Sequence, residues 1–191
     1  GAGLAWLLFR LVHPEELVAE GEAEAECAPG LFERCLAECA GTFYLVLTVG
    51  LNVLAGERLA AWSIAASLST MVYATGCISG GHLNPAVTVA LQLRGVAGWQ
   101  DWAYLPSQLL GGISGACLAR LLSPSPAALA LGPGPGFALL DAGAAELAFT
   151  TLLCFLVLSI ATVKDKDVSP MVGLAVGSCV TAGGVSLGRV S

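Results

Sequence analysis

Charged side chains are scarce in this sequence of 191 residues: they make up 12% of it, while hydrophobic residues make up 56%. Soluble domains carry about twice that share of charge, so a water-covered globular surface is excluded. Lys and Arg number 8 against 14 Asp and Glu, giving a net charge of −6. The chain has no basic patch to hold phosphates, which excludes a nucleic-acid binder. With a mean hydropathy of +0.80, these shortages indicate an integral, multi-pass membrane protein.

The cysteines also lack the spacing of a functional site. There are seven, they form no C-x-x-C pair, and most lie inside apolar runs. They are typical of small hydrophobic side chains, and not of a disulfide framework or a zinc site. No nucleophile, general base and oxyanion donors converge anywhere in the sequence. We therefore expect no enzymatic activity, no cofactor and no bound metal.

The N-terminal region concentrates negative charge. Six of the acidic residues lie close together there: Glu15, Glu16, Glu20, Glu22, Glu24 and Glu26. This block predicts a solvated acidic tail over residues 1–32. The apolar run from Leu4 to Phe9 has no basic region before it, so it is not interpreted as a signal peptide.

Five apolar stretches follow, each close to the ~20 residues that a helix needs to cross a bilayer. They run from about Cys35 to Ala55, Leu59 to Ile78, Trp102 to Ala119, Ala142 to Val163 and Val168 to Gly188. The third begins with aromatic residues expected at the membrane interface: Trp99, Trp102 and Tyr104. A Pro- and Gly-rich segment, 123–141, predicts a long loop outside the membrane.

A sixth apolar stretch, from Asn84 to Leu93, is half as long as a span. Asn84 is a favoured N-cap, and Pro85 suits the first helical position. Arg94 and Gly95 are a suitable stop for the same helix. A stretch of this length predicts a re-entrant half-helix, here entering the membrane from the side of the N-terminus.

The chain contains an internal repeat. Residues 36–47 and 144–155 are identical at five of twelve aligned positions, and Glu38 coincides with Glu146. The second copy begins three spans after the first, so it enters the membrane from the opposite side, which is typical of channels and transporters. Residues 33–122 then form a first repeat and 142–191 part of a second.

The step from Glu38 to Asn84, taken from Glu146, leads to position 192. If Val190-Ser191 corresponds instead to Ile78-Ser79, the counterpart of Asn84 would lie a few positions further on. By either alignment, we expect the sequence to stop before a second half-helix.

The residues from Ser79 to Thr88, Ser-Gly-Gly-His-Leu-Asn-Pro-Ala-Val-Thr, resemble the first signature loop of the major intrinsic proteins, the aquaporins and aquaglyceroporins. The repeated Ala-Glu-x-x-x-Thr, Gln108 and Gly-Leu-Ala-Val-Gly at 173–177 extend the resemblance from about Glu33 to the C-terminus. It implies an all-α membrane protein, an aquaporin-like inverted-repeat helical bundle with one re-entrant half-helix. The last re-entrant helix and the sixth span are missing.

The resemblance implies a transmembrane channel for water or small neutral solutes such as glycerol. Its path would be lined by the signature loop, through Gly80, Gly81, His82, Asn84, Pro85 and Ala86. Non-helical backbone at membrane depth is tolerated where it lines a wet cavity or is buried in protein. The positive N-terminus of the half-helix would oppose cations and protons. Three further residues are interpreted as structural polar groups: Glu38, Glu146 and Gln108.

The family's narrowest constriction is expected at Ile64 on the second span and Gly184 on the fifth. Water-specific members usually have an aromatic residue and a His at these places. Apolar or small residues there suggest a wider constriction that admits glycerol-type solutes. Two glycine pairs, Gly111/Gly115 and Gly173/Gly177, predict close-packed helix seams.

The expected partners are membrane lipid, the permeating solute and three further copies in a homotetramer, as in the family. Two alternatives stay open. The first alternative to a channel is a non-conducting subunit that associates with a full-length channel. The second is an ion-coupled transporter that uses Glu38 and Glu146. Because the family's pore needs two half-helices, we expect the 191 residues alone to conduct poorly.

Overall fold

The computed structural model describes residues 2–12, 29–123, 132–161 and 171–190, and within these ranges it contains helices and no strands. The elements are α1 (Ala2–Val12), α2 (Leu31–Ala55), α3 (Ala60–Ser79), α4 (Pro85–Arg94), the 3-10 helix η2 (Trp99–Ala103), α5 (Tyr104–Leu121), α6 (Leu139–Ala161) and α7 (Val172–Leu187). A helix lies at each of the five long apolar stretches and at the half-length one. The expected all-α class is confirmed.

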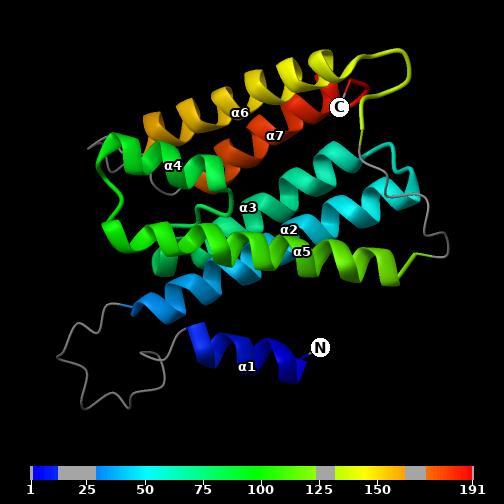
Figure 1. Ribbon diagram of the computed structural model, residues 1–191. Coiled ribbons are helices and arrows are strands. Elements are labelled where there is room, and N and C mark those ends of the chain that lie inside the picture. The colour runs from blue at the N-terminus through cyan, green and yellow to red at the C-terminus, as the bar shows by residue number, and fades with distance from the viewer. Residues whose placement is uncertain (1, 13–28, 124–131, 162–170, 191) are drawn as a thin grey trace, which may run out of the picture.

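The helices form two groups, which meet through α3 and α7 and through the short helix α4. Figure 1 shows α2, α3 and α5 lying along one another, with α6 and α7 as a pair on one side of them. α7 packs on α3, and α4 contacts both α5 and α6 near one end of the bundle. Apolar side chains of α3, α4, α6, α7 and the loop between α3 and α4 form the main core where the groups meet: Leu68, Val72, Leu83, Val87, Leu91, Val157 and Val176. The half-helix is therefore packed against protein through its buried residues, Val87, Thr88 and Leu91.

Glycines set the distance between α2 and α5. A methyl group on Gly111 would collide with the carbonyl of Cys39, and one on Gly115 would lie 2.6 Å from the carbonyl oxygen of Phe43. The pair thus lets two helix backbones touch, as small-xxx-small pairs do in membranes. A methyl group on Gly177 would likewise lie 2.7 Å from the carbonyl oxygen of Ala65, on α3. The predicted seams are confirmed.

Three of the described helices are long and apolar enough to cross a membrane: Leu31–Ala55, Ala60–Ser79 and Leu139–Ile160. The helices at the other two expected spans are less apolar or shorter. α5 carries Ser107, Gln108 and Ser114 among its 18 residues, and α7 has 16 residues. The expected start of the fifth span, at 168–170, and the end of the fourth, at 162–163, lie outside the described residues.

The N-terminal region differs from the expected tail. Residues 2–12 form α1, whose Val12 is buried against Ala37 and Ile78. α2 begins at Leu31, before the expected start of the first span at about Cys35. The reason is a tertiary contact: the apolar run docks on α2, which the spacing of residues in the sequence does not reveal. The acidic block from Glu15 to Glu26 lies outside the described residues, as does 124–131 of the Pro- and Gly-rich loop.

Gly111→Ala is expected to destabilise the bundle by about 1–3 kcal/mol, because the new methyl group forces α5 away from α2. Gly112→Ala is the matched control. Its methyl group meets only side chains, the nearest at 3.7 Å, and alanine favours the helix by up to ~1 kcal/mol. Thermal unfolding in detergent should therefore show a lower midpoint for the first variant alone. Equal midpoints would contradict the backbone-contact account.

Candidate functional site

The loop between α3 and α4 has an unusual backbone. Gly80 ends α3 with a φ of 89° and Gly81 follows with a φ of 62°, a region open to glycine. Leu83 also has a positive φ, 50°, although it carries a side chain. Such a conformation persists only where the surroundings hold it. The Leu83 side chain is 2% exposed, and its carbonyl accepts a hydrogen bond from Thr42 Oγ1 at 3.4 Å.

Glu38 on α2 holds this loop from beneath. Its side chain is fully buried, and its carboxylate accepts four hydrogen bonds. Oε1 accepts from Ser79 Oγ at 2.6 Å and from the His82 backbone N–H at 2.9 Å. Oε2 accepts from the Leu83 backbone N–H at 2.6 Å and from Gln108 Nε2 at 2.8 Å. A buried carboxylate requires such donors, and the inward, backbone-accepting role expected of Glu38 is what the structure shows.

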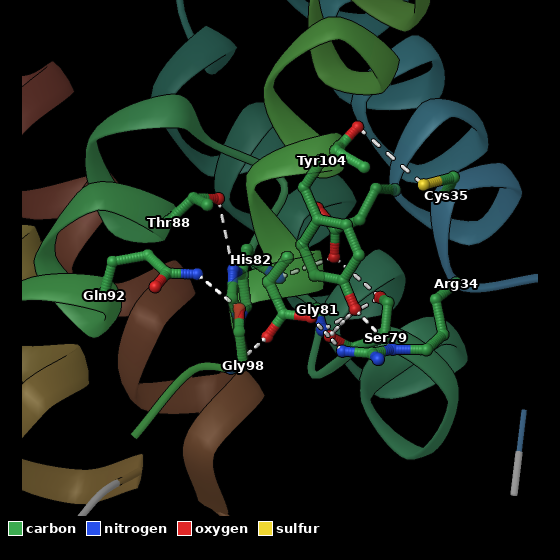
Figure 2. A network of polar contacts seen from close by, with 12 residues as sticks. Arg34, Cys35, Ser79, Gly81, His82, Thr88, Gln92, Gly98 and Tyr104 are labelled. Atoms are coloured by element: carbon green, nitrogen blue, oxygen red, sulfur yellow. Dashed lines mark hydrogen bonds and ion pairs between the residues drawn. The ribbon is translucent and has the colours of Figure 1, made fainter. Parts of the chain in front are cut away.

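The polar contacts continue from Gln108 into the half-helix. Gln108 Nε2 also donates to Thr88 Oγ1 on α4 at 3.0 Å. The His82 ring pairs its Nδ1 with the same Thr88 hydroxyl at 3.1 Å and stacks edge-on against Tyr104, with ring centroids 5.0 Å apart. Figure 2 shows the His82 ring between Thr88 and Tyr104. The His82 side chain thus packs the loop onto α4 and α5, and only its backbone remains for the opposite side.

A second network ties the same loop to the start of α5, and the sequence interpretation missed it. Arg34 on α2 forms an ion pair with Asp101 of η2 and donates from Nε to the Tyr104 hydroxyl at 2.7 Å. That hydroxyl donates to the Ser79 carbonyl at 3.0 Å. Tyr104 is fully buried, so its side chain contacts protein, whereas Trp99 is 84% exposed. The available signal was an Arg, an Asp and a Tyr at the borders of apolar stretches.

A cavity of about 880 Å³ lies on the open side of the loop. α2, α3, α4, α6 and α7 surround it, mostly with aliphatic side chains. Of the predicted path residues, Gly80, Gly81, His82 and Asn84 line it, and so do the two predicted constriction residues, Ile64 and Gly184. Pro85 and Ala86 are not among the lining residues. Cys179 on α7 also lines the cavity, which the sequence interpretation did not anticipate.

On the side of the loop, the polar groups at this cavity come from the loop backbone and from Asn84, while other parts of the cavity are bordered by Glu57, Arg58, Glu146, Thr150 and Arg189. Within the described residues, no donor reaches the carbonyls of Gly80, Gly81 and His82. Asn84 Oδ1 caps α4 by accepting from the Ala86 backbone N–H at 2.8 Å. Within the described residues, the amide N–H groups of Asn84 donate to no protein acceptor. Carbonyl acceptors, amide donors and the positive end of α4 are therefore gathered at one wall.

Glu146 does not behave as Glu38 does. Its side chain on α6 is exposed and borders the cavity. Among the described residues it accepts no hydrogen bond from backbone, unlike Glu38. The physical reason is that no loop comparable to 79–84 lies against α6 in the part of the chain that the structure describes. That part also holds no group of three His, Cys, Asp or Glu side chains suited to a metal.

Comparisons with known proteins agree with this geometry. A family model described as Major intrinsic protein matches residues 26–191. The chain is 33% identical over 175 residues to Aquaporin NIP1-4 of Oryza sativa subsp. japonica, covering 83% of this chain and 61% of that protein. It is 37% identical over 121 residues to Aquaporin-4 of Bos taurus, covering 61% and 38%. It is 31% identical over 157 residues to Nodulin-26 of Glycine max, covering 76% and 57%.

Glu38→Gln is expected to destabilise the protein by about 2–4 kcal/mol, because an amide presents N–H groups to donors that need an acceptor. Glu146→Gln is the matched control, since it changes an exposed carboxylate at the repeat-related position and should have an effect within about 0.5 kcal/mol. Thermal unfolding and protease sensitivity of the loop in detergent measure the difference. Comparable losses in the two variants would refute the anchoring role of Glu38.

Proposed function

The chain belongs to the major intrinsic protein family, and on that premise we propose that it contributes one half-helix and its loop to a transmembrane channel for water or small neutral solutes. The chain spans 58% to 62% of the length of the plant relatives that it matches over most of its own length. The activity of the whole protein is therefore inferred from the geometry of this part. The observation that carries the proposal is the wall of free carbonyls and amide donors in the cavity.

The wall suits a neutral, hydrogen-bonding solute. The carbonyls of Gly80, Gly81 and His82 accept hydrogen bonds in place of the water that a solute loses on entry. Asn84 donates at the point where α4 begins, and the positive helix end there opposes cations. The opposite walls, from α6 and α7, are mostly apolar, with Glu146 and Thr150 as their polar side chains. This combination favours water and short polyols over ions.

The width of the path follows from Ile64 and Gly184. Both line the cavity, and neither offers a polar group from its side chain. We propose that they border the constriction and make it less polar than a water-specific one, so that glycerol-type solutes pass. The tetrameric assembly of the family is proposed for this protein as well, with one path in each subunit.

A non-conducting subunit is the second candidate. The observation that favours it is Glu146, which borders the cavity without a backbone partner among the described residues. An ion-coupled transporter has less support, because the four hydrogen bonds to Glu38 leave that carboxylate with no free position for an exchanging proton.

Osmotic swelling separates these candidates. Vesicles that hold the product of the complete reading frame are expected to swell faster than empty vesicles, in water and in glycerol. The 191 residues alone are expected to pass little, because a single half-helix closes only one side of the path. Fast swelling with the 191 residues alone would contradict this expectation. Swelling that requires a proton gradient would support the transporter instead.

Asn84→Asp in the conducting protein is expected to weaken the exclusion of cations, because it places a negative charge at the cavity end of α4. The carboxylate can still cap the helix, so folding should be kept. Asn84→Ser is the matched control, since serine also caps and remains neutral. Cation current across a planar bilayer should rise for the Asp variant only. Current through the unmodified protein would refute the neutral-solute proposal.

A further inference from the structure

α1 has the surface of a membrane-embedded helix without the length of one. Its 11 residues rise about 16 Å, roughly half of the ~30 Å hydrocarbon core. Among the described residues, one side of α1 is docked, where Val12 and Leu8 pack against Leu36, Ala37 and Ile78. Four large apolar side chains on its other sides are each 44% to 68% exposed: Leu4, Trp6, Leu7 and Leu11. A surface of this kind requires an apolar partner.

The docking position indicates which partner. Ala37 is in the second turn of α2, a helix that is long and apolar enough to cross the membrane. Ile78 is in the last turn of α3, directly before the loop that begins the half-helix. α1 therefore lies against the flank of a span near its end, as Figure 1 shows. The first turn of α2 exposes Leu31 and Phe32 as well, so the apolar surface of α1 continues the lipid-facing surface of the bundle.

We propose that α1 is an interfacial helix that lies in the bilayer surface, on the side where the half-helix enters, with lipid acyl chains covering its exposed apolar residues. Arg10 is the one charged residue of α1, and its guanidinium stacks over the Trp6 ring, 4.7 Å from the ring centroid. An Arg above an aromatic ring combines an apolar body with a charged head, which is typical of side chains at the headgroup boundary.

Apolar contact, and not charge, drives this binding. Interfacial helices that depend on anionic lipid carry several Lys or Arg on their polar side. α1 has a single Arg, and the sequence that follows it contains six Glu between positions 15 and 26. Anionic headgroups would repel that block. The lipid that α1 fits is therefore the acyl region of a zwitterionic bilayer, the one that the chain already spans.

Trp6 reports the environment of α1 directly. The protein is reconstituted in phosphatidylcholine vesicles with bromine on the upper acyl-chain carbons, and the emission of Trp6 is taken as the difference from the Trp6→Phe variant. We expect bromine to remove about half of that emission, and iodide in the buffer to remove little of it, as for a side chain below the headgroups. Trp62→Phe is the control, since it removes an exposed Trp that lies on α3 and not on α1.

Three results would overturn the proposal. Quenching of Trp6 by iodide and not by bromine would place α1 in water. Protection from both quenchers would mean that protein covers α1. Dependence of the bromine quenching on added phosphatidylserine would show that charge, and not apolar contact, holds it. Because Trp6 is more than half exposed, its replacement by Phe removes no core contact, and thermal unfolding in detergent serves as the check on folding.

Discussion

The carboxylate of Glu38 is buried at membrane depth, and the rest of the site follows from the need to surround it with donors. A charge in such a place is costly unless it is paired or hydrogen-bonded. The loop after α3 supplies two backbone N–H groups and a serine hydroxyl, and α5 supplies an amide. Since the N–H groups of His82 and Leu83 turn toward Glu38, the carbonyls of the preceding residues turn the other way, toward the cavity. One buried charge thereby orients a row of acceptors.

This arrangement depends on how closely the helices pack. Gly111 and Gly115 bring the α5 backbone onto α2, and only at that distance does Gln108 reach both Glu38 and Thr88. The contacts of Arg34 with Asp101 and Tyr104 then fix the start of α5 against α2 and the end of α3. Leu83 keeps its left-handed conformation because side chains of α2 bind both its backbone carbonyl and its backbone N–H. The loop is rigid because three helices hold it.

Much of this fold could be predicted from the sequence. The lengths of the apolar stretches predicted the five long helices, and Asn84 with Pro85 predicted the start of the half-helix, which ends at Arg94 as expected. The isolated carboxylate of Glu38 predicted an inward, hydrogen-bonded position. These signals are local, because each depends on a run of neighbouring residues or on one residue type in an apolar setting.

The features that could not be predicted depend on contacts between distant residues. Arg34 forms hydrogen bonds with Asp101 and Tyr104, about seventy positions away in the sequence. No periodicity in the sequence connects these residues. α1 docks through Val12 on two different helices. Glu146 shares part of the sequence context of Glu38 but lacks a loop beside it among the described residues, so similar local patterns lead to different environments.

Hydrogen exchange of the loop amides in the lipid-embedded protein tests the central claim most directly. If Glu38 holds the loop, the amides of His82 and Leu83 exchange as slowly as those in the middle of α4, although they belong to no helix. The same two amides should exchange quickly when residue 38 cannot accept their hydrogen bonds. Fast exchange in the unmodified protein would show that the loop is not held by the carboxylate, and the orientation of its carbonyls toward the cavity would lose its physical basis.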